Sequence, residues 1–404
     1  MKILILDMGS RMNRFGGEQR VSAMLYDKLK KYFETFYLGY KTDYIKKSKN
    51  TIMIPRSVNL KNARNSVLSE MLLFRTAYYY FFVRKLNKLG MPKTELLNKI
   101  SQIKPDIIIS NSIHDFALLK YLKNKKINFK SMYIDHGSIS TSNTTGYFSK
   151  EGIPLTVGTG INSTSIKDAK SKFFNFFNIN IALNMAQFKA INSFTKKVAY
   201  IPNSLDVKVL SDKKIEKAIR KKYNIGEKDF VFLYIGRMFD RQKNVSTLVK
   251  AFTKIKNPKF RLLLVGDGPS VNIYKELASG DNRVTFTGRF DGDMVNYIYN
   301  ISNAMVLPSV WEGFALTILE AAAHKIPLIV SKNVYTEDYK NKSINLVSFS
   351  TFNENELKEL MERIAVDTKF KKAAIKESEK LSKIFNGKTM IRSYEKLLKK
   401  LNNV

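Results

Sequence analysis

Two glutamates separated by seven residues mark a segment in the second half of the chain, which reads EGFALTILEA from Glu312. Gly313 frees the backbone where a helix should begin, so the amides that follow it can bind a phosphate group. Glu320 lies two helical turns beyond Glu312, where a carboxylate can accept hydrogen bonds from both hydroxyls of a ribose. An amphipathic helix with one exposed acid is the alternative interpretation. The amides in question are those of Phe314, Ala315 and Leu316.

A candidate diphosphate site follows the apolar run that ends in Gly236 and Arg237, with Lys243 just before the next helical pattern. An arginine at a strand end and a lysine in the following loop can neutralise a diphosphate together, the arginine as a planar fork and the lysine as a point charge. Two solvated cations in a very basic protein would give the same pattern, and the pair taken alone favours that interpretation.

A glycine pair, Gly16 and Gly17, lies in the loop that leads from the first apolar run into a helical pattern. Glycines at a helix N-terminus let backbone amides approach an anion closely. Steric relief in a tight turn explains the pair equally well. The loop does not contain GxGxxG, so the usual fingerprint of a nicotinamide dinucleotide site is absent from it.

The composition argues against several kinds of chemistry. The chain has no cysteine and three histidines, which excludes disulfides and thiolate nucleophiles and disfavours a His-rich metal site. His136 follows an apolar run and is a candidate site residue. His114 could line a ligand cleft, cap a helix or be buried. We expect His324, at the end of the helix that contains Glu320, to act as a favourable C-terminal cation.

The length and the charge of the chain suggest its size class and its partners. With 404 residues and 44% hydrophobic content, the chain should form about two domains. The net charge is +34, of which residues 1–205 carry +21 and residues 206–404 carry +13. Such a field favours nucleic acid, anionic lipid headgroups or phosphate-bearing substrates, unless it reflects only a lysine-rich composition.

No segment reads as a secretory leader or as a membrane span. The first apolar run is short and is broken by Asp7, so we expect a strand and a cytoplasmic protein. No uncharged apolar stretch approaches the ~18 residues of a spanning helix. Residues 71–85 are apolar and aromatic but are interrupted by Arg75, and could lie on a membrane surface.

Short apolar runs alternate with amphipathic helical patterns in both halves, which predicts parallel sheets covered by helices on both faces. The pattern starts afresh after Pro202 and Asn203, so we predict domains at 1–205 and 206–387 and a helix at 388–404 that packs back on the first domain. Ligands bind at the carboxyl ends of parallel strands, so the two domains should face each other across a cleft. The predicted strands are 3–6, 106–110, 131–134, 230–235, 261–265, 284–286, 304–307 and 327–330, and the main predicted helices are 21–32, 213–222, 246–256 and 315–324.

In combination, these motifs resemble glycosyltransferase family 4, a group of retaining enzymes with the GT-B fold. The segment from Glu312 to Ala321 is similar to the family's hallmark, and the resemblance spans nearly the whole chain. It implies an α/β protein of two Rossmann-like domains facing across a cleft, with a C-terminal helix that returns to the N-terminal domain. The other landmarks are Gly16-Gly17, KPDIII from Lys104, His136, IPN from Ile201, Gly236-Arg237 with Lys243, GDGP from Gly266, and Pro308-Ser309.

The resemblance also implies roles for single residues. Arg237 and Lys243 would hold the donor diphosphate and stabilise the leaving nucleotide in place of a metal ion. Glu312 would contact the donor sugar, Glu320 the ribose, and His136 would lie near both sugar and acceptor. The implied catalytic residues are His136, Arg237, Lys243 and Glu312; the implied substrate-binding residues are Gly16, Gly17, Gly236, Gly288, Arg289, Gly313, Phe314, Ala315, Leu316 and Glu320.

We therefore expect a retaining, metal-independent hexosyltransferase without a cofactor. Its donor would be a nucleotide diphosphate sugar that carries a hexose or N-acetylhexosamine. We favour a UDP-sugar, because UDP is the commonest donor type in the family that the chain resembles. Its acceptor would be a lipid-linked or cell-surface glycan of the capsule, lipopolysaccharide, teichoic acid or exopolysaccharide type. A polyanionic acceptor would suit the positive charge of the chain. Besides donor and acceptor, the expected partner is an anionic membrane surface and not nucleic acid, with the protein peripheral on the inner face of the plasma membrane.

Two other functions remain open. A GT-B nucleotide-sugar epimerase would use the same diphosphate site but needs acid and base residues around the sugar in the N-terminal domain. A nucleic-acid-binding protein is suggested by the net charge and by the stretch KFFNFF from Lys172, although no recognition module accompanies them. Asp291-Gly292-Asp293 mimics the DxD metal motif of another glycosyltransferase class, and we expect it to turn the chain and cap a helix at 294–300.

Overall fold

The computed structural model describes residues 1–7, 17–40, 45–54, 93–112, 115–136, 163–290, 292–334 and 336–403. Gly16, His114, Asp291 and the segment 71–85 lie outside the described residues. The chain forms two compact units, of which the first is Met1–Asn203 with Thr389–Val404 and the second is Ser204–Lys388. The boundary thus falls two residues before the predicted one, in the same proline–asparagine turn.

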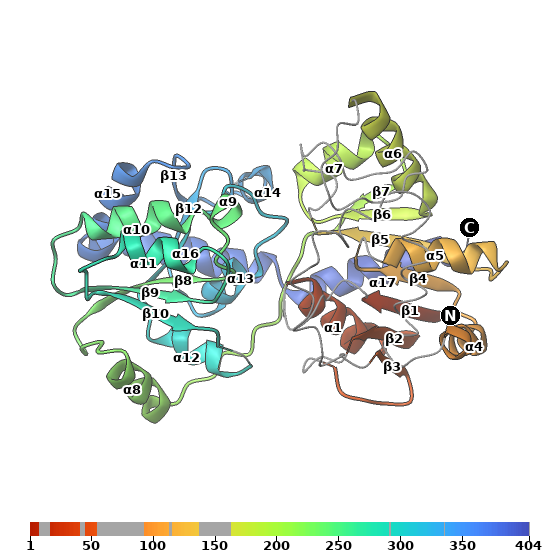
Figure 1. The fold of residues 1–404 in the computed structure, drawn as a ribbon, viewed down its shortest axis with the longest axis horizontal. Helices are drawn as coiled ribbons and strands as arrows, with labels where there is room; N and C mark the ends of the chain where they lie inside the picture. The colour runs from red at the N-terminus through yellow and green to blue at the C-terminus, as the bar shows by residue number, and fades with distance from the viewer. Residues whose placement is uncertain are drawn as a thin grey trace. The chain divides into compact units, whose positions relative to one another are not determined.

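The N-terminal unit contains a parallel sheet in the order β3-β2-β1-β4-β5-β6-β7. The order reverses between β1 and β4, as in doubly wound folds, and ligands of such folds bind beside that point at the carboxyl ends of the strands. Figure 1 shows the seven strands in this order. Their bounds are β1 Lys2–Asp7, β2 Glu34–Tyr40, β3 Thr51–Ile54, β4 Ile107–Ser110, β5 Lys130–Asp135, β6 Ile179–Ala182 and β7 Val198–Tyr200.

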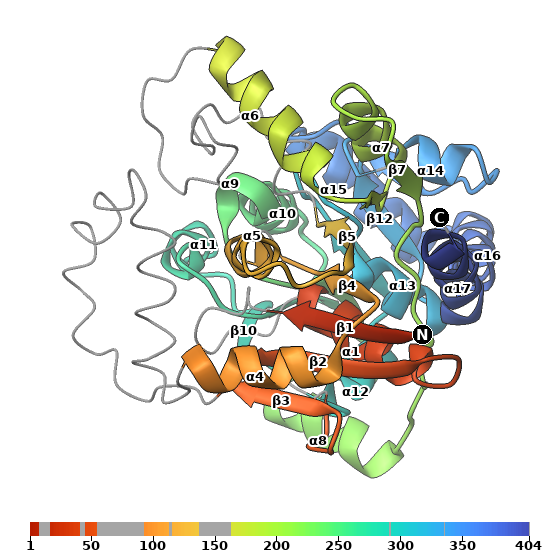
Figure 2. The same ribbon diagram turned by 90° about the vertical axis from the view of Figure 1, so that its right-hand side faces the viewer.

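Helices cover both faces of this sheet. Figure 2 shows α4, α5 and α6 on one face, and α1 packs against β1 and β2. The last helix, α17, belongs to the N-terminal unit, where the Lys130 Nζ donates to the Leu401 carbonyl oxygen at 2.9 Å. This return of the C-terminal helix was predicted. The helices are α1 Gly17–Leu29, α4 Lys93–Ile103, α5 Phe116–Asn124, α6 Ser163–Phe176, α7 Met185–Asn192 and α17 Gly387–Asn403.

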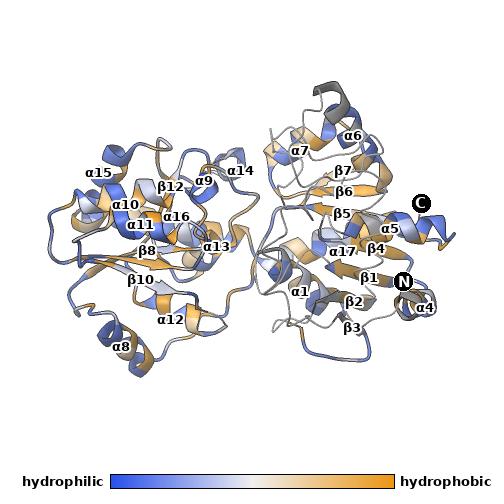
Figure 3. Cartoon of the chain, in the orientation of Figure 1, coloured by the Kyte–Doolittle hydropathy of each residue, from blue (hydrophilic) through white to orange (hydrophobic). Residues whose placement is uncertain are grey.

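Aromatic side chains fill the core between α5, α6 and the sheet. Phe173, Phe174 and Phe177 have no exposed surface, and the ring of Tyr133 on β5 lies 5.1 Å from that of Phe173. The apolar strands of both sheets stand out in Figure 3. The KFFNFF stretch, which motivated the nucleic-acid alternative, therefore contributes mainly to core packing: Phe173, Phe174 and Phe177 are fully buried and cannot stack on bases, and Phe176 is partly buried.

The C-terminal unit contains a second parallel sheet, in the order β10-β9-β8-β11-β12-β13. The order again reverses at one point, between β8 and β11, so the loops after these two strands are neighbours at the carboxyl edge. The strands are β8 Phe230–Ile235, β9 Phe260–Val265, β10 Val284–Gly288, β11 Ala304–Leu307, β12 Leu328–Ser331 and β13 Val347–Phe349.

Helices also cover both faces of the second sheet. Helix α10 packs against α11 and α15, α13 packs against α16, and α12 packs against α8. Helix α13 is buried along most of its length, with Leu316 and residues 318–322 withdrawn from solvent, and its sequence LTILEAAA contains strong helix formers. The helices are α8 Lys213–Lys222, α9 Asp240–Lys243, α10 Val245–Thr253, α11 Val271–Leu277, α12 Met294–Asn300, α13 Leu316–Ala323, α14 Glu337–Lys340, α15 Glu354–Val366 and α16 Thr368–Ile384.

Candidate active site

Close packing of glycine backbones joins the loops at the carboxyl edge of the second sheet. A Cβ atom on Gly266, at φ 136°, would lie 1.9 Å from the Gly236 carbonyl oxygen, so the two loops approach more closely than any side chain allows. The Met238 amide donates to the Asp267 carbonyl oxygen at 2.9 Å. The GDGP landmark thus has a structural task, because it lets the loop after β9 support the loop that carries Arg237.

Arg237 begins the loop after β8 and is exposed. The Tyr234 hydroxyl donates to the Arg237 carbonyl oxygen at 2.8 Å, and this hydrogen bond holds the turn in place. The guanidinium group lies 5.4 Å from the centre of the Phe239 ring, a cation–π distance. The backbone of this arginine is fixed while its charged end reaches solvent, as an anion-binding arginine requires.

Lys243 and Glu312 form an ion pair, with 2.6 Å between Nζ and Oε1 and with 17% and 12% of their side chains exposed. The Ser309 hydroxyl donates to the same Oε1 at 2.6 Å. The pair lies at the carboxyl edge, because Lys243 ends α9 after β8 and Glu312 follows β11. The structure therefore brings together two residues that the sequence separates widely.

Three hydrogen bonds hold these two loops in place. The Val310 amide donates to the Gln242 carbonyl oxygen at 2.7 Å, and the Asn244 side chain donates to the Pro308 carbonyl oxygen at 3.2 Å. The Gln242 side chain donates to the Trp311 carbonyl oxygen at 3.3 Å. Asn244 has a left-handed backbone, φ 49°, which asparagine tolerates better than most residues, and this turn separates α9 from α10.

Helix α13 begins at Leu316, directly after Gly313, Phe314 and Ala315. The predicted helix start is thus present at the carboxyl edge, where its free amides can meet an anion. Glu320 lies inside the helix and is 5% exposed, and one of its carboxylate oxygens accepts a 2.8 Å hydrogen bond from the Tyr299 hydroxyl. Because Glu320 is buried and hydrogen-bonded, its side chain is less mobile than that of an exposed acid would be.

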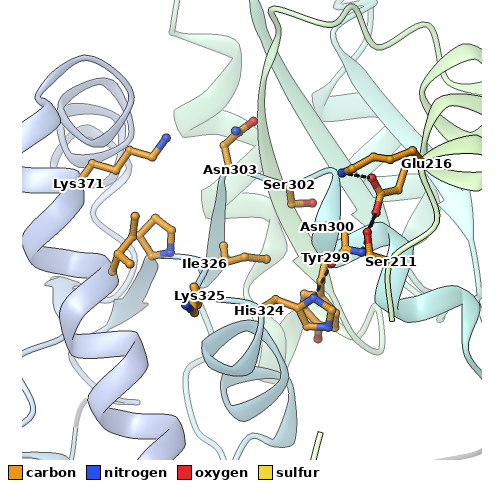
Figure 4. Close-up of a pocket in the computed structure, with 13 residues that line it drawn as sticks. Ser211, Glu216, Tyr299, Asn300, Ser302, Asn303, His324, Lys325, Ile326 and Lys371 are labelled. Carbon is orange, nitrogen blue, oxygen red and sulfur yellow. Dashed lines mark hydrogen bonds and ion pairs between the residues drawn. The ribbon is translucent and has the colours of Figure 1, made fainter. Parts of the chain in front are cut away.

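A cavity of about 340 Å³ lies at the other end of α13, beside the residues that precede β11 and β12. Figure 4 shows Tyr299 and His324 side by side in its wall, with Lys371 opposite. Its polar groups largely bond to one another, as in the contacts of Asn300 with Glu216 and with His324. The predicted site residues do not line this cavity, which acts as the polar support of α12 and α13.

His324 corrects one prediction. Its ring stacks on Tyr299 with centroids 5.1 Å apart, and its Nδ1 lies 2.7 Å from the Asn300 Oδ1. Burial lowers its pKa to about 4, so the residue is neutral at physiological pH. It ends the helix as predicted, but it is no C-terminal cation, because the desolvation cost of a charge here outweighs the attraction of the helix dipole.

The loop after β10 contains the residues assigned to the base. Gly288 has φ 73° and accepts a 2.8 Å hydrogen bond from the Gly266 amide, which joins this loop to the two described above. Arg289 is exposed. Asp293 precedes α12 as predicted but its side chain makes no capping hydrogen bond, so the expected cap is wrong. Among the described residues, no group of three His, Asp or Glu side chains could hold a metal ion.

Polar residues also gather at the carboxyl edge of the first sheet. His136 directly follows β5, and its Nε2 lies 2.8 Å from the Oδ1 of Asn111, which follows β4. Burial lowers the pKa of His136 to about 4. Asp7 ends β1, fully buried, and burial raises its pKa to about 6. Sequence reasoning identified His136 but not its neighbours, although polar residues that end three apolar strands were a usable signal. Gly17 starts α1 at the same edge.

The C-terminal unit matches a known protein family. Residues 215–381 match the family of glycosyl transferases group 1, and all of them lie within Ser204–Lys388. The chain carries a group 1 glycosyltransferase domain. The predicted resemblance to a glycosyltransferase family is thereby confirmed.

Two relatives whose names state an activity align with parts of this chain. The UDP-Gal:alpha-D-GlcNAc-diphosphoundecaprenol alpha-1,3-galactosyltransferase of Escherichia coli is 33% identical over 144 residues, 33% of this chain and 36% of the relative. The alpha-monoglucosyldiacylglycerol synthase of Acholeplasma laidlawii is 23% identical over 265 residues, 61% of this chain and 64% of the relative. The chain thus spans less than two thirds of the length of either relative.

Solved structures establish the fold over the full chain. Anabaena HepE, determined in complex with UDP and glucose, superposes with a TM-score of 0.71 at 16% identity, covering 99% of this chain and 100% of its own. The prediction of a GT-B fold with two Rossmann-like units is therefore confirmed. At this identity the likeness concerns the fold alone.

Proposed function

We propose that this glycosyltransferase transfers a hexose or N-acetylhexosamine from a nucleotide diphosphate sugar, of the UDP type, to a lipid-linked glycan, with retention of the anomeric configuration. The observation that supports it best is the ion pair of Lys243 and Glu312 at the carboxyl edge. Together with Arg237 and the N-terminus of α13, this pair supplies cations for a diphosphate and a carboxylate for sugar hydroxyls in one place.

The donor would be held by charge and by hydrogen bonds. Arg237 and Lys243 bind the diphosphate, assisted by the amides of Phe314, Ala315 and Leu316 at the start of α13. Glu320 accepts from the ribose hydroxyls, and the backbone of Gly288 and Arg289 meets the base. Gly236 and Gly313 keep the adjoining backbone free of side chains.

In the transfer step, an acceptor hydroxyl oxygen bonds to the anomeric carbon while the bond from that carbon to the diphosphate oxygen breaks. The hydroxyl proton passes to the leaving diphosphate, so atoms and charge balance without a carboxylate nucleophile. Negative charge grows on the diphosphate as the bond breaks, and Arg237 and Lys243 stabilise it there. In the N-terminal unit, His136 is the residue that we propose for contact with the substrate. We propose that no metal ion takes part.

The relatives support a lipid-linked acceptor. By their names, the Escherichia coli protein acts on a sugar linked to diphosphoundecaprenol and the Acholeplasma protein makes a glucosyl lipid. No helix among the described residues is long and apolar enough to cross a membrane. We propose that the protein instead docks on the anionic inner face of the plasma membrane.

Exposed lysines at the amino edge of the first sheet support this docking. They occur in the loops that precede β2, β3, β4, β5 and β7, so they share one edge of a sheet whose strands lie about 4.8 Å apart. Lysine, a point charge, suits a diffuse surface potential better than a single ligand. These lysines are Lys30, Lys31, Lys46, Lys47, Lys49, Lys104, Lys125, Lys126, Lys196 and Lys197.

Docking by this edge constrains the acceptor. The edge lies at the opposite end of β5 from His136, and six residues of strand span roughly 20 Å at about 3.3 Å each. A hydroxyl at His136 would therefore be at least that far from the lipid headgroups. An acceptor glycan several sugars long can reach this height.

Calorimetric binding of UDP, GDP and ADP in EDTA tests the donor site. We expect one diphosphate to bind without metal, and Arg237→Ala and Glu320→Gln each to weaken its binding tenfold or more, since charged hydrogen bonds are worth about 1.5–3 kcal/mol. Lys250→Ala, an exposed change on α10, is the matched control and should bind as the parent does. Absence of binding for every diphosphate would contradict the proposal.

Incubation with the sugar donor separates transfer from epimerisation. A transferase releases the nucleoside diphosphate at a rate that depends on added acceptor glycan. An epimerase converts the donor into a second nucleotide sugar with no acceptor present, which NMR of the anomeric protons would reveal. The second result would replace the proposal by the epimerase alternative.

A further inference from the structure

A chain of buried hydrogen bonds links His136 to Asp7 at the carboxyl edge of the first sheet. The His136 Nε2 lies 2.8 Å from the Asn111 Oδ1, and the Asn111 Nδ2 donates to the Ser22 Oγ. The Ser22 hydroxyl in turn faces the Asp7 carboxylate and favours its ionised form, and the buried Asp7 Oδ1 is the oxygen left without another partner among the described residues. His136 follows β5, Asn111 follows β4, Ser22 lies in α1 and Asp7 ends β1, so the chain of side chains crosses the carboxyl ends of three neighbouring strands and a helix.

The backbone of Asn111 is held in place by a second buried carboxylate. Asp115 Oδ2 accepts from the amides of Asn111 and Ser112, each at 3.0 Å. Asn111 and Ser22 are themselves buried, with no exposed surface. The amide side chain therefore has a fixed origin and two fixed contacts, one toward His136 and one toward Ser22.

The direction of these bonds follows from what each group can donate. An ionised carboxylate can only accept, so the Ser22 hydroxyl must donate its proton to Asp7. Ser22 then accepts from the Asn111 amide nitrogen, which leaves the Asn111 oxygen facing His136. A carbonyl oxygen also only accepts, so the His136 Nε2 must carry the hydrogen and Nδ1 must be the ring nitrogen with the lone pair.

We propose that Asp7, acting through Ser22 and Asn111, holds His136 as the Nε2–H tautomer and thereby presents Nδ1 as a hydrogen-bond acceptor for a substrate hydroxyl. Asp7, Ser22 and Asn111 are positioning residues, since they act through His136. This inference rests on the proposed function in one respect only: the proposed function says which substrate supplies the hydroxyl that binds to Nδ1. A neutral imidazole is required, and burial provides it by lowering the pKa of His136 to about 4.

Asp7→Asn is the decisive substitution, because it keeps the size of the side chain and removes the charge. An amide can donate or accept toward Ser22, so the direction of the chain is no longer imposed. Tyr37→Phe is the matched control: the Tyr37 hydroxyl donates to the Asp7 Oδ2 at 3.3 Å but takes no part in the path to His136.

The measurement is ¹⁵N NMR of the imidazole rings in the full chain, which has three histidines, with His136→Gln to assign the signal. In the parent protein and in Tyr37→Phe, we expect Nδ1 to resonate as the unprotonated nitrogen and Nε2 as the protonated one. In Asp7→Asn and in Ser22→Ala, a substantial Nδ1–H population should appear. An unchanged tautomer in both variants, or the Nδ1–H form in the parent protein, would overturn the inference.

Transfer kinetics give a second readout in the same variants. We expect kcat in Asp7→Asn to fall about tenfold to a hundredfold with the donor KM nearly unchanged, as for a loss of proton positioning in the reacting complex. Ser22→Ala reports on the chain if Asp7→Asn does not fold. The tautomer is measured without substrate, so a failure of the proposed transferase activity leaves the test of the chain intact.

Discussion

The side chains of Lys243 and Glu312 are 2.6 Å apart although 69 residues separate them in the chain. In this state Glu312 neutralises the lysine that the proposed mechanism assigns to the diphosphate. Donor binding must therefore divide Lys243 between Glu312 and the phosphate oxygens. Ser309 bonds to the same carboxylate oxygen, so Glu312 retains one partner when Lys243 turns to the donor.

Glu312→Gln should raise the affinity for the nucleoside diphosphate several-fold and lower the rate of transfer at least a hundredfold. The affinity rises because Lys243 is no longer neutralised by an ion pair, and the rate falls because the contact of the carboxylate with the sugar is lost. Calorimetry with the diphosphate and single-turnover kinetics with the sugar donor measure the two effects. Lys243→Met is the comparison and should weaken diphosphate binding. A loss of diphosphate affinity in both variants would contradict competition for Lys243.

Asp7 should make the stability of the protein depend on pH. Burial raises its pKa from 3.8 to about 6, so between these values the folded state keeps a proton that the unfolded state has released. Its contribution to the free energy of unfolding therefore falls as the pH rises through this window, by roughly 3 kcal/mol in total. Asp7→Asn has no such proton, and its stability relative to the parent should increase by up to that amount between about pH 4 and pH 7.

Urea unfolding of both proteins at several pH values measures this difference. The comparison with the parent is needed because burial lowers the pKa of His136 and of His324, whose contributions change in the opposite sense. Both proteins contain these histidines, so their effects cancel in the difference. A stability difference that stays constant with pH would mean that Asp7 titrates normally in the folded state.

At the scale of elements, α13 joins the candidate site to its support. Its N-terminus lies at the carboxyl edge, Glu320 is held by Tyr299 of α12, and His324 at its end stacks on the same tyrosine. One tyrosine therefore fixes both the proposed ribose ligand and the end of the helix. The neutral state of His324 is part of this arrangement, since a charged ring would have to be desolvated beside Tyr299.

NMR titration of His324 should give a pKa near 4, well below the ordinary value of 6.5. Burial is the physical reason for this low pKa. It follows that in His324→Gln the free energy of unfolding should fall less as the pH drops from about 6.5 to 4. In that range the unfolded chain binds a proton that the folded histidine refuses, so stability falls with the pH. A pKa above 6.5 would instead restore the interpretation of His324 as a C-terminal cation.

At the scale of the molecule, more of the positive charge lies in the first half of the chain, with +21 for residues 1–205 against +13 for residues 206–404. The exposed lysines before the strands of the first sheet face few acids, chiefly Asp27, Glu34 and Asp106. The corresponding edge of the second sheet also carries three acids, Glu227, Asp229 and Asp281, beside exposed lysines such as Lys228, Lys256 and Lys259. The positions of the lysines alone therefore do not single out the first sheet, and a comparison of vesicle binding is needed to distinguish the two edges.

Vesicle sedimentation tests the lysine edge as a membrane contact. The fourfold change of Lys125, Lys126, Lys196 and Lys197 to serine should weaken binding to vesicles with anionic lipid by about tenfold or more, since each surface lysine is worth about 1 kcal/mol before screening. Binding should also fall with salt.

The matched control changes four exposed lysines of the C-terminal unit, Lys217, Lys250, Lys372 and Lys376, to serine, and removes the same total charge. Equal effects of the two sets would show that net charge and not the lysine edge attracts the vesicles. Equal binding of the parent protein to neutral and anionic vesicles would exclude the membrane contact altogether.

Local patterns predicted the elements of the second unit well. The runs at 230–235 and 304–307 are β8 and β11, and 213–222 is α8, because each combines a clear period with turn residues at its ends. Strands β2, β3, β6 and β13 were not predicted. The sequence of β2, ETFYLGY, begins with a charge and contains a glycine, and the other three are short, so their pairing in the sheet and not their own pattern makes them strands.

The sequence by itself determined the resemblance to a glycosyltransferase family, the two-unit organisation and the loops that carry candidate residues, because strand–helix alternation and short motifs are local. Only the tertiary structure decided that Lys243 meets Glu312, because that contact depends on β8 and β11 being neighbours in a sheet whose order differs from the order of the chain. It likewise decided that His136, Asn111, Ser22 and Asp7 form one hydrogen-bonded chain, and that Phe173 and His324 are desolvated. Proximity and burial are properties of packing, and no spacing of residues along the chain contains them.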